Sequence, residues 1–284
     1  MNQLPVLSWI DRMDWRLQIL LLVLCLSIDV YLFVVCFLKN REPWYDVFFK
    51  IFGSNYFCLF ILHRLHIQLG TYLQNPDAFS VWSWLNWTAV MLMFVFFMVA
   101  YVTRSNPVSR ANRAREILYP LFCAALPFII YESIDFYRYA IFKDHALLVA
   151  LFKPFMDLPP GHWNVPSIVL IIGGHLISVW ALIYLKRSFG ILTEVRNLVT
   201  SGPYRYIRHP LYIGESIAVI GFCFYFPSWF NVAITLTFLV SQRIRAHFEE
   251  QKFLLAIPAY SEYMQRSGAY LPRPGKAAGN PQPL

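Results

Sequence analysis

The sequence predicts an all-α fold, a polytopic membrane helical bundle of about seven transmembrane segments with a helical hairpin towards the C-terminus. Two observations predict this fold class. Apolar residues make up 58% of the 284-residue chain and charged residues only 14%, a balance that a soluble protein of this size could not bury. The apolar residues also form long blocks, and a membrane-spanning helix requires a block of about 20 residues.

Seven apolar segments follow one another, with boundaries expected to shift by several residues. They are Leu17–Leu38, Val47–Leu69, Trp82–Val102, Ile117–Tyr131, Pro166–Leu185, Leu211–Phe226 and Ser228–Gln242. The second segment carries Lys50 and Arg64, so we expect it to be tilted or partly interfacial. The last two are short and separated only by Pro227-Ser228, which predicts a tight hairpin whose second helix continues beyond the bilayer.

Positive charge is distributed unevenly between alternate loops. If successive segments cross in opposite directions, residues 39–50, 103–116, 186–210 and the C-terminal tail share one face, and they hold 18 of the 24 Lys and Arg residues. Because such charge concentrates on the cytoplasmic side, we expect a multi-pass integral membrane protein with a cytoplasmic C-terminus, in a bacterial inner membrane or the endoplasmic reticulum. The same asymmetry accounts for the net charge of +8 without a nucleic-acid partner.

The chain divides into three predicted parts. Residues 1–165 would be N-terminal transmembrane helices that could form the substrate side, residues 166–272 a membrane domain with the polar motifs, and residues 273–284 a disordered tail. The five cysteines lie inside apolar segments and are expected to pack there. His63 and His66 have helical spacing but no third ligand, so we expect no metal site.

Two polar clusters flank the predicted hairpin. The stretch 201–215 contains two arginines, one histidine, three tyrosines and two prolines, and the stretch 245–250 reads Arg-Ala-His-Phe-Glu-Glu. A short hairpin returns the chain to the side from which it started, so both clusters should meet at one pocket facing the cytosol. Membrane proteins place such groups at the edge of the bilayer chiefly for function.

The residue types in these clusters suit a polar ligand with a flat ring. On a helix, Arg245 and Glu249 lie on one face, one turn apart. His209 can donate or accept a hydrogen bond near neutral pH, and tyrosines such as Tyr212 offer flat faces with polar tips. Taken alone, the same residues also fit a surface ion pair and an aromatic belt at the membrane interface.

The order of these residues resembles the isoprenylcysteine carboxyl methyltransferase-like family and the related phospholipid N-methyltransferases. The motifs are Leu198-Val199-Thr200, Gly202-Pro203-Tyr204, Arg208-His209-Pro210, Tyr212, Gly214, Arg245-x-x-x-Glu249-Glu250 and Tyr260-x-x-Tyr263. The resemblance covers residues 185–272. It departs from the family at Ile257-Pro258, where Phe-Gly is common, and in a spacing from Glu249 to Tyr260 that is one residue shorter than expected.

The resemblance implies an integral membrane methyltransferase that uses S-adenosylmethionine (SAM) and acts on a lipidic or small hydrophobic acceptor. The cofactor-binding residues that it implies are Leu198, Val199, Tyr204, His209, Pro210, Leu211, Tyr212 and Glu249. It implies catalytic roles for Arg245, which would orient the acceptor, and for Glu249. Carboxylate O-methylation is favoured because it needs no base, whereas a thiol or amine would lose its proton to Glu249 or His247.

Two other functions remain open at this stage. Some sterol reductases have a similar C-terminal hairpin, so a membrane-bound NADPH-dependent reductase of a sterol-like lipid is the alternative enzyme. A non-enzymatic transporter or scaffold is the alternative of another class, but a transporter predicts inverted repeats or broken helices in matching halves, and the sequence shows neither.

Overall fold

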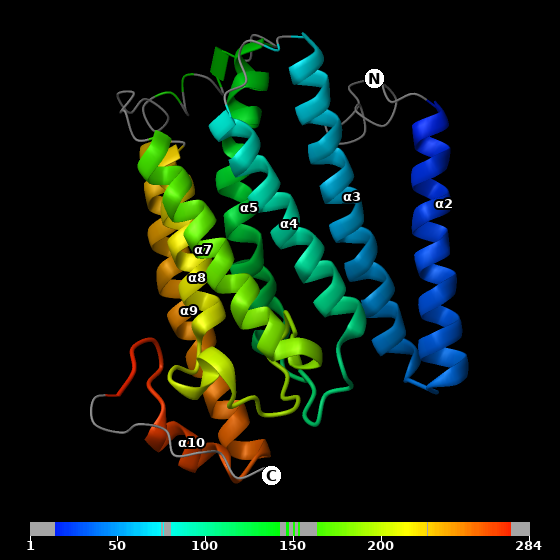
Figure 1. Ribbon diagram of the computed structural model, residues 1–284, viewed down its shortest axis with the longest axis vertical. Helices are drawn as coiled ribbons and strands as arrows, with labels where there is room; N and C mark the ends of the chain where they lie inside the picture. Colours follow the sequence, from blue (N-terminus) through cyan, green and yellow to red (C-terminus); the bar gives the residue numbers. More distant parts are fainter. Residues whose placement is uncertain are drawn as a thin grey trace. The chain divides into compact units, whose positions relative to one another are not determined.

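The computed structural model describes residues 15–74, 76, 81–142, 146–147, 150, 153, 164–225 and 227–273. In this part of the chain the regular secondary structure is helical, and two isolated β-bridges, Ser109–Val195 and Ile207–Gly268, join parts of the connecting loops. The elements are α2 (Trp15–Leu32), a π-helical turn η1 (Phe33–Lys39), α3 (Trp44–Gln74), α4 (Val81–Thr103), α5 (Ala114–Phe142), α7 (Asn164–Leu185), η3 (Lys186–Ser188), η4 (Gly202–Arg205), α8 (Pro210–Tyr225), α9 (Trp229–Ala256) and α10 (Tyr260–Arg266), as Figure 1 shows. Each predicted apolar segment lies on a helix, which confirms the all-α class.

Three of the described helices are long and apolar enough to cross a membrane. They are Trp44–His66, Trp84–Thr103 and Val165–Ser188, and α8 is a shorter apolar helix. These helices fit a membrane protein. The number of seven spans and the cytoplasmic side of the C-terminus stay predictions.

The chain forms two compact units. The first comprises Met1–Ser80 with Phe94–Asn106, and the second comprises Val81–Met93 with Pro107–Leu284. The second unit holds every residue that the motifs single out. The functional division at residue 165 stays a prediction, and the predicted tail beyond Arg273 lies outside the described residues.

In the first unit, two polar contacts explain charges within apolar helices. Asp29 of α2 accepts hydrogen bonds from Asn55 Nδ2 of α3 at 3.0 and 3.2 Å. Lys50 donates to Glu42 at 2.8 Å, so its charge is paired although its side chain is buried. Pairing of this kind lowers the cost of a charged group in an apolar helix.

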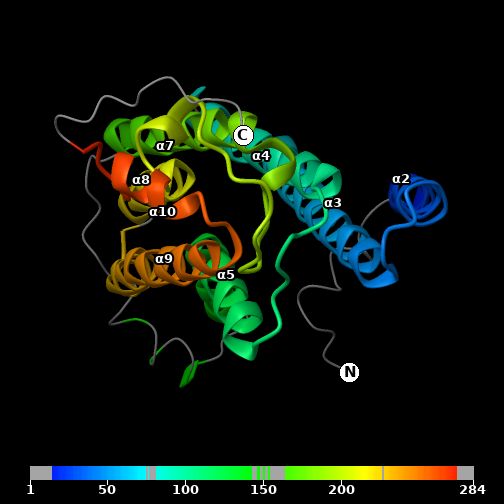
Figure 2. The same ribbon diagram turned by 90° about the horizontal axis from the view of Figure 1, so that it is seen from below.

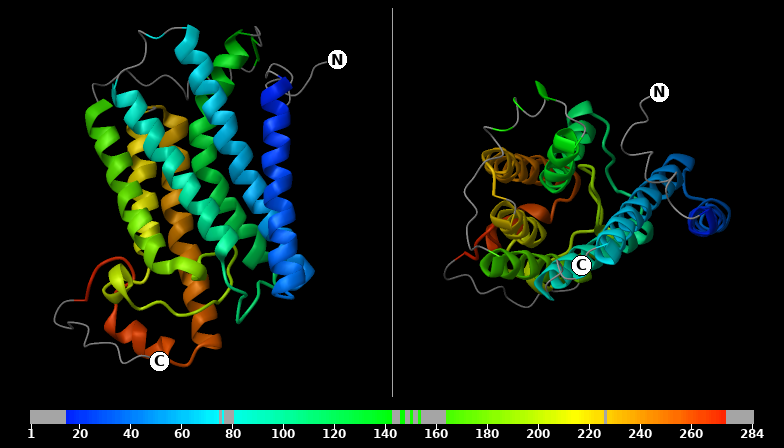
Figure 3. Two further views of the ribbon diagram at one scale, coloured as in Figure 1. Left: turned by 45° about the vertical axis from the view of Figure 1, so that its right-hand side comes forward. Right: turned by 90° about the horizontal axis from the view of Figure 1, so that it is seen from above.

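In the second unit, α7 and α8 pack against each other through glycines. A Cβ atom at Gly174 would lie 2.5 Å from Gly214 O and from Ala218 N, and one at Gly214 would lie 2.6 Å from Gly174 O. The two helices therefore approach to backbone contact, and Figure 3 shows them side by side. The close contact is specific to Gly174, because a Cβ at Gly173 would meet nothing within 4 Å.

The hairpin of α8 and α9 forms as the sequence predicts. Ser228 caps α9, because its Oγ accepts a hydrogen bond from Asn231 N at 3.0 Å. The helix α9 continues past Gln242 to Ala256, as expected, and then turns into α10. Figures 1 and 2 place α10 at the same end of this unit as the start of α8.

The glycine contact gives a matched pair of variants. Gly174→Ala should lower the unfolding free energy by about 1–3 kcal/mol, since the added methyl group forces α7 and α8 apart. Gly173→Ala should be neutral or raise it slightly, because alanine favours a helix over glycine by up to ~1 kcal/mol. Thermal unfolding of both purified variants measures the difference, and shifts of the same sign and size would contradict the contact.

Candidate functional site

The loop before α8 is held in place by the segment after α10. Backbone hydrogen bonds join Arg208 N to Gly268 O at 2.8 Å, His209 N to Ala269 O at 3.1 Å and Gly268 N to Tyr206 O at 3.1 Å. The Arg208 guanidinium also donates to Ser267 O at 2.5 Å. The backbone at Arg208 and His209 is therefore held by a segment that the motif does not include.

Glu250, on α9, contacts the residues just before α8, and these contacts form the first polar layer of the site. Its Oε1 accepts a hydrogen bond from Arg208 Nε at 2.7 Å and lies 3.0 Å from His209 Nε2. Burial raises the pKa of Glu250, but the hydrogen bonds with His209 and Arg208 outweigh this and lower the pKa to about 2. Glu250 is therefore ionised at neutral pH and ties α9 to the loop.

Glu249, one residue earlier on α9, makes the contacts that form the second polar layer. Tyr212 OH donates to Glu249 Oε1 at 2.5 Å, and Arg245 Nε donates to the same oxygen at 3.2 Å. The Tyr212 ring stacks on His209 with centroids 5.4 Å apart and planes 7° apart, and the Arg245 guanidinium carbon lies 5.1 Å from the Tyr212 ring centre. The structure therefore brings the two predicted polar clusters together at one end of the hairpin.

Arg245 is buried and held by protein groups on several sides. Besides Glu249, its Nη2 donates to Ile191 O at 2.7 Å. Burial lowers the pKa of Arg245, but the neighbouring Tyr212, Glu249 and Glu215 outweigh this and raise it, so the side chain stays charged. These contacts use much of the donor capacity with which Arg245 was expected to orient an acceptor.

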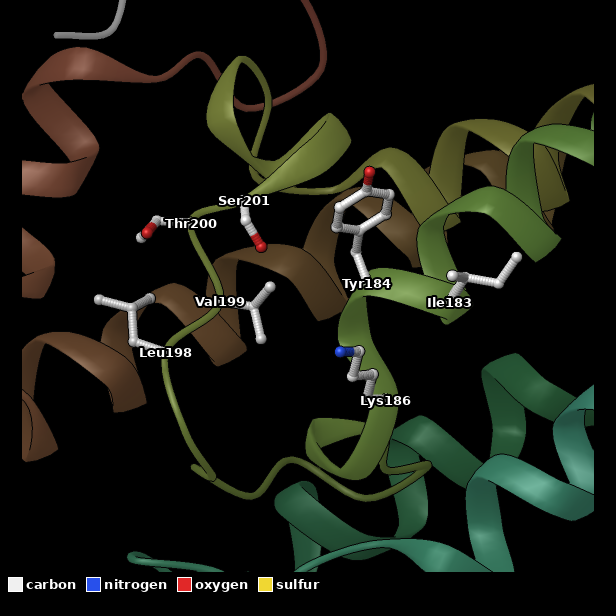
Figure 4. A pocket seen from close by; sticks show the side chains of 7 residues that line it. All are labelled: Ile183, Tyr184, Lys186, Leu198, Val199, Thr200 and Ser201. Carbon is white, nitrogen blue, oxygen red and sulfur yellow. The ribbon is translucent and has the colours of Figure 1, made fainter. Parts of the chain in front are cut away.

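Leu198 and Val199 lie at a different place from the polar cluster. They line an open pocket of about 580 Å³ whose described lining does not include His209, Tyr212 or Glu249. Its lining residues are Ile183, Tyr184, Lys186, Leu198, Val199, Thr200 and Ser201, which Figure 4 shows. The predicted cofactor-binding residues therefore fall into two groups, one at this pocket and one at the polar cluster.

The remaining predicted residues support these two groups. Pro210 and Leu211 are buried in the first turn of α8. Tyr204 is buried in η4, and its backbone carbonyl accepts a hydrogen bond from Tyr263 OH at 2.7 Å. Gly202 has φ of +59° and contacts the Tyr184 ring, so the turn into η4 requires glycine. His247, the alternative base, is exposed and lies beside Phe248.

The loop that carries Leu198 and Val199 is anchored by residues that the motifs do not predict. Val195 pairs with Ser109 through a backbone hydrogen bond of 2.9 Å, and Thr193 N donates to Glu116 O at 3.1 Å. Lys252 Nζ, on α9, donates to Glu116 Oε2 and to Arg110 O, each at 2.6 Å. No spacing in the sequence indicates this contact, because its members lie more than a hundred residues apart.

Ile257-Pro258, where the sequence departs from the family, forms the short connection between α9 and α10. Ile257 N donates to Phe253 O at 2.8 Å and ends α9. Tyr260 then stacks on Phe253 with ring centroids 5.0 Å apart. The departure is thus accommodated in a tight turn while Glu249 and Glu250 keep their contacts.

The described residues form helices, three of which are apolar and long enough to cross a membrane. A polar cluster lies at the open end of the α8–α9 hairpin. Residues 164–260 match the model of the phospholipid methyltransferase family. The resemblance inferred from the motifs is confirmed over these residues. Among the described residues, no group of three or more His, Cys, Asp or Glu side chains is placed to hold a metal ion.

Two characterised proteins are similar to this chain. The cobalt-zinc-cadmium resistance protein CzcN of Cupriavidus metallidurans is 29% identical over 119 residues, which cover 40% of this chain and 53% of that protein. Phosphatidylethanolamine N-methyltransferase B of Dictyostelium discoideum is 27% identical over 145 residues, which cover 48% of this chain and 72% of that protein. The chain thus spans about half the length of the first relative.

The ionised Glu250 predicts a pH dependence of stability. A carboxylate whose pKa falls from 4.5 to about 2 on folding stabilises the native state above about pH 4.5, and this contribution is lost as the pH falls towards 2. Glu250→Gln should lower the unfolding free energy at neutral pH by about 2–3 kcal/mol and flatten its dependence below about pH 4.5. Unfolding of the two proteins between about pH 2 and 7 measures this.

The matched control is Glu262→Gln, which neutralises an exposed carboxylate that pairs with Arg266 on α10. An exposed pair of this kind contributes up to about 1 kcal/mol. If Glu250→Gln kept the acid sensitivity of the wild type, the ion pairs of Glu250 would not stabilise the fold.

Proposed function

We propose that this protein is an integral membrane methyltransferase that uses SAM and methylates a lipidic or membrane-partitioned acceptor. The observation that carries the proposal is the convergence of His209, Tyr212, Arg245 and Glu249 at one end of the α8–α9 hairpin. The match of residues 164–260 to a methyltransferase family supports it. The similarity to phosphatidylethanolamine N-methyltransferase B supports a lipid acceptor.

The chemistry of the cluster suits SAM. In the described structure both Glu249 and Glu250 use only Oε1 in hydrogen bonds, so each has a second oxygen available for an ammonium or a ribose hydroxyl. The stacked rings of His209 and Tyr212 offer an aromatic surface to a sulfonium or a purine. The cofactor role expected for Leu198 and Val199, which line a different pocket together with Tyr184, stays a proposal.

When bound, SAM supplies an electrophilic methyl group to a nucleophile on the acceptor. The contribution of the chain is to hold that nucleophile close to the methyl group and to exclude water. Tyr212 and Arg245 fix the Glu249 carboxylate, and Arg208 and His209 fix Glu250. The site is thus organised by contacts within the protein, which reduces the ordering that binding requires.

The acceptor group is a carboxylate, a thiol or an amine. An acceptor carboxylate would need donors from Arg245, and Arg245 already donates to Glu249 and to Ile191 O. The cluster also exposes carboxylate oxygens, which repel an anion and attract a cation. These contacts favour an acceptor that donates hydrogen bonds over the carboxylate that the motif first suggests.

The direct test is to incubate the purified full chain with isotopically labelled SAM and total membrane lipid and to identify the labelled molecule. A labelled lipid is the expected result. Equilibrium binding of SAM and of NADPH is measured in parallel. Binding of NADPH without SAM would overturn the proposal and support the reductase.

Glu249→Gln should weaken SAM binding by about tenfold or more and lower turnover, because the amide keeps the Tyr212 hydrogen bond but loses the charge. Glu262→Gln should leave both unchanged, since Glu262 lies on the surface of α10. Isothermal titration with SAM gives the affinity, and label incorporation gives the turnover. Equal affinity in wild type and Glu249→Gln would remove Glu249 from the cofactor site.

A further inference from the structure

Glu215 and Gln242 form a third polar layer beyond the two layers at Glu250 and Glu249. Glu215 lies three residues after Tyr212 on α8, and Gln242 lies three residues before Arg245 on α9, so each continues the polar face of its helix by about one turn. Gln242 Nε2 donates to Glu215 Oε2 at 2.6 Å. The polar contacts between α8 and α9 therefore extend further into the hairpin than the contacts of the motif residues.

Gln242 has an unmet hydrogen-bonding need. Its side chain is 2% exposed, and its Oε1 has no hydrogen-bond partner. In this orientation the NH₂ group faces Glu215, and Oε1 is left without a donor among the described residues. Proteins rarely leave a buried acceptor without a donor. The orphaned oxygen therefore points to a ligand that brings one.

Glu215 offers a second acceptor beside the first. In the described structure it hydrogen-bonds only through Oε2, so Oε1 keeps its capacity to accept a hydrogen bond. A ligand that satisfies both the Glu215 carboxylate oxygen and the Gln242 amide oxygen must donate at least two hydrogen bonds. A positive charge on this ligand would pair with the carboxylate. An amino group in its ammonium form has both properties.

We propose that Glu215 and Gln242 bind the amino group of the methyl acceptor and that Glu215 takes its proton. The inference rests on the proposed function. An ammonium gives one proton to Glu215, which frees the nitrogen lone pair. That pair forms the bond to the methyl carbon, the bond from this carbon to the sulfonium sulfur breaks, and its electrons stay on sulfur. The proton on Glu215 then passes to water.

SAM also carries an ammonium group, on its amino-acid portion, which can donate the same hydrogen bonds. Binding measured separately for each molecule distinguishes the two sources. The acceptor probe is dihexanoyl phosphatidylethanolamine, titrated into the full chain in detergent without SAM, and the reference probe is dihexanoyl phosphatidylcholine, which has no N–H group. SAM is titrated alone.

Glu215→Gln should weaken binding of the phosphatidylethanolamine probe by about tenfold or more and lower its methylation by a larger factor, while SAM binding stays unchanged. Gln242→Leu should weaken binding of the same probe and leave binding of phosphatidylcholine unchanged, because only the first probe donates to Oε1. Glu262→Gln, the surface control, should match the wild type in every titration. A merely structural role for the pair would not discriminate between the two lipids.

The inference would be overturned if Glu215→Gln bound phosphatidylethanolamine as tightly as the wild type does. It would also be overturned if this variant bound SAM more weakly and the lipid with unchanged affinity. If Glu215→Gln fails to fold, Gln242→Leu decides on the same titrations. If the wild type binds the amine probe through Glu215 yet transfers no methyl group, the proposed function fails and the amine site stands. If methylation continues at the wild-type rate in Glu215→Gln, the site fails and the function stands.

Discussion

The contact on which the site depends is the hydrogen bond from Tyr212 to Glu249, reinforced by Arg245. It joins the first turn of α8 to the part of α9 that continues beyond the hairpin. A carboxylate that accepts from two buried donors in a low dielectric is strongly held, and each donor would be costly to leave unpaired. Because the same contact aligns the His209 ring, it sets the geometry of the whole polar cluster.

Two further constraints keep this contact in place. Gly174 and Gly214 allow α7 and α8 to meet at backbone distance, which fixes the axis of α8. The Lys252 ammonium ties α9 to Glu116 and to the loop at Arg110, so the far side of α9 is held as well. The helices that carry the cluster are thus positioned by small residues on one side and by a buried ion pair on the other.

The polar groups are arranged in layers along the hairpin, from Glu250 through Glu249 to Glu215. The first two carboxylates are held by arginines, whereas Glu215 is held by a neutral amide. The outer layers therefore organise the site, and the inner layer keeps one buried acceptor oxygen, Gln242 Oε1, without a hydrogen-bond partner among the described residues. This difference separates residues that shape the site from residues that await a ligand.

The sequence alone determined the helical class and the position of the helices, because apolar blocks and turn residues are local signals. It also determined that the polar clusters at 201–215 and 245–250 meet, since a short hairpin must return the chain to its starting side. Only the tertiary structure decided that Leu198 and Val199 line a separate pocket. It also decided that Arg245 donates a hydrogen bond to Ile191 O and that Gln242 faces Glu215. These contacts depend on helix rotation and loop packing, which join residues distant in the chain and leave no periodic pattern in the sequence.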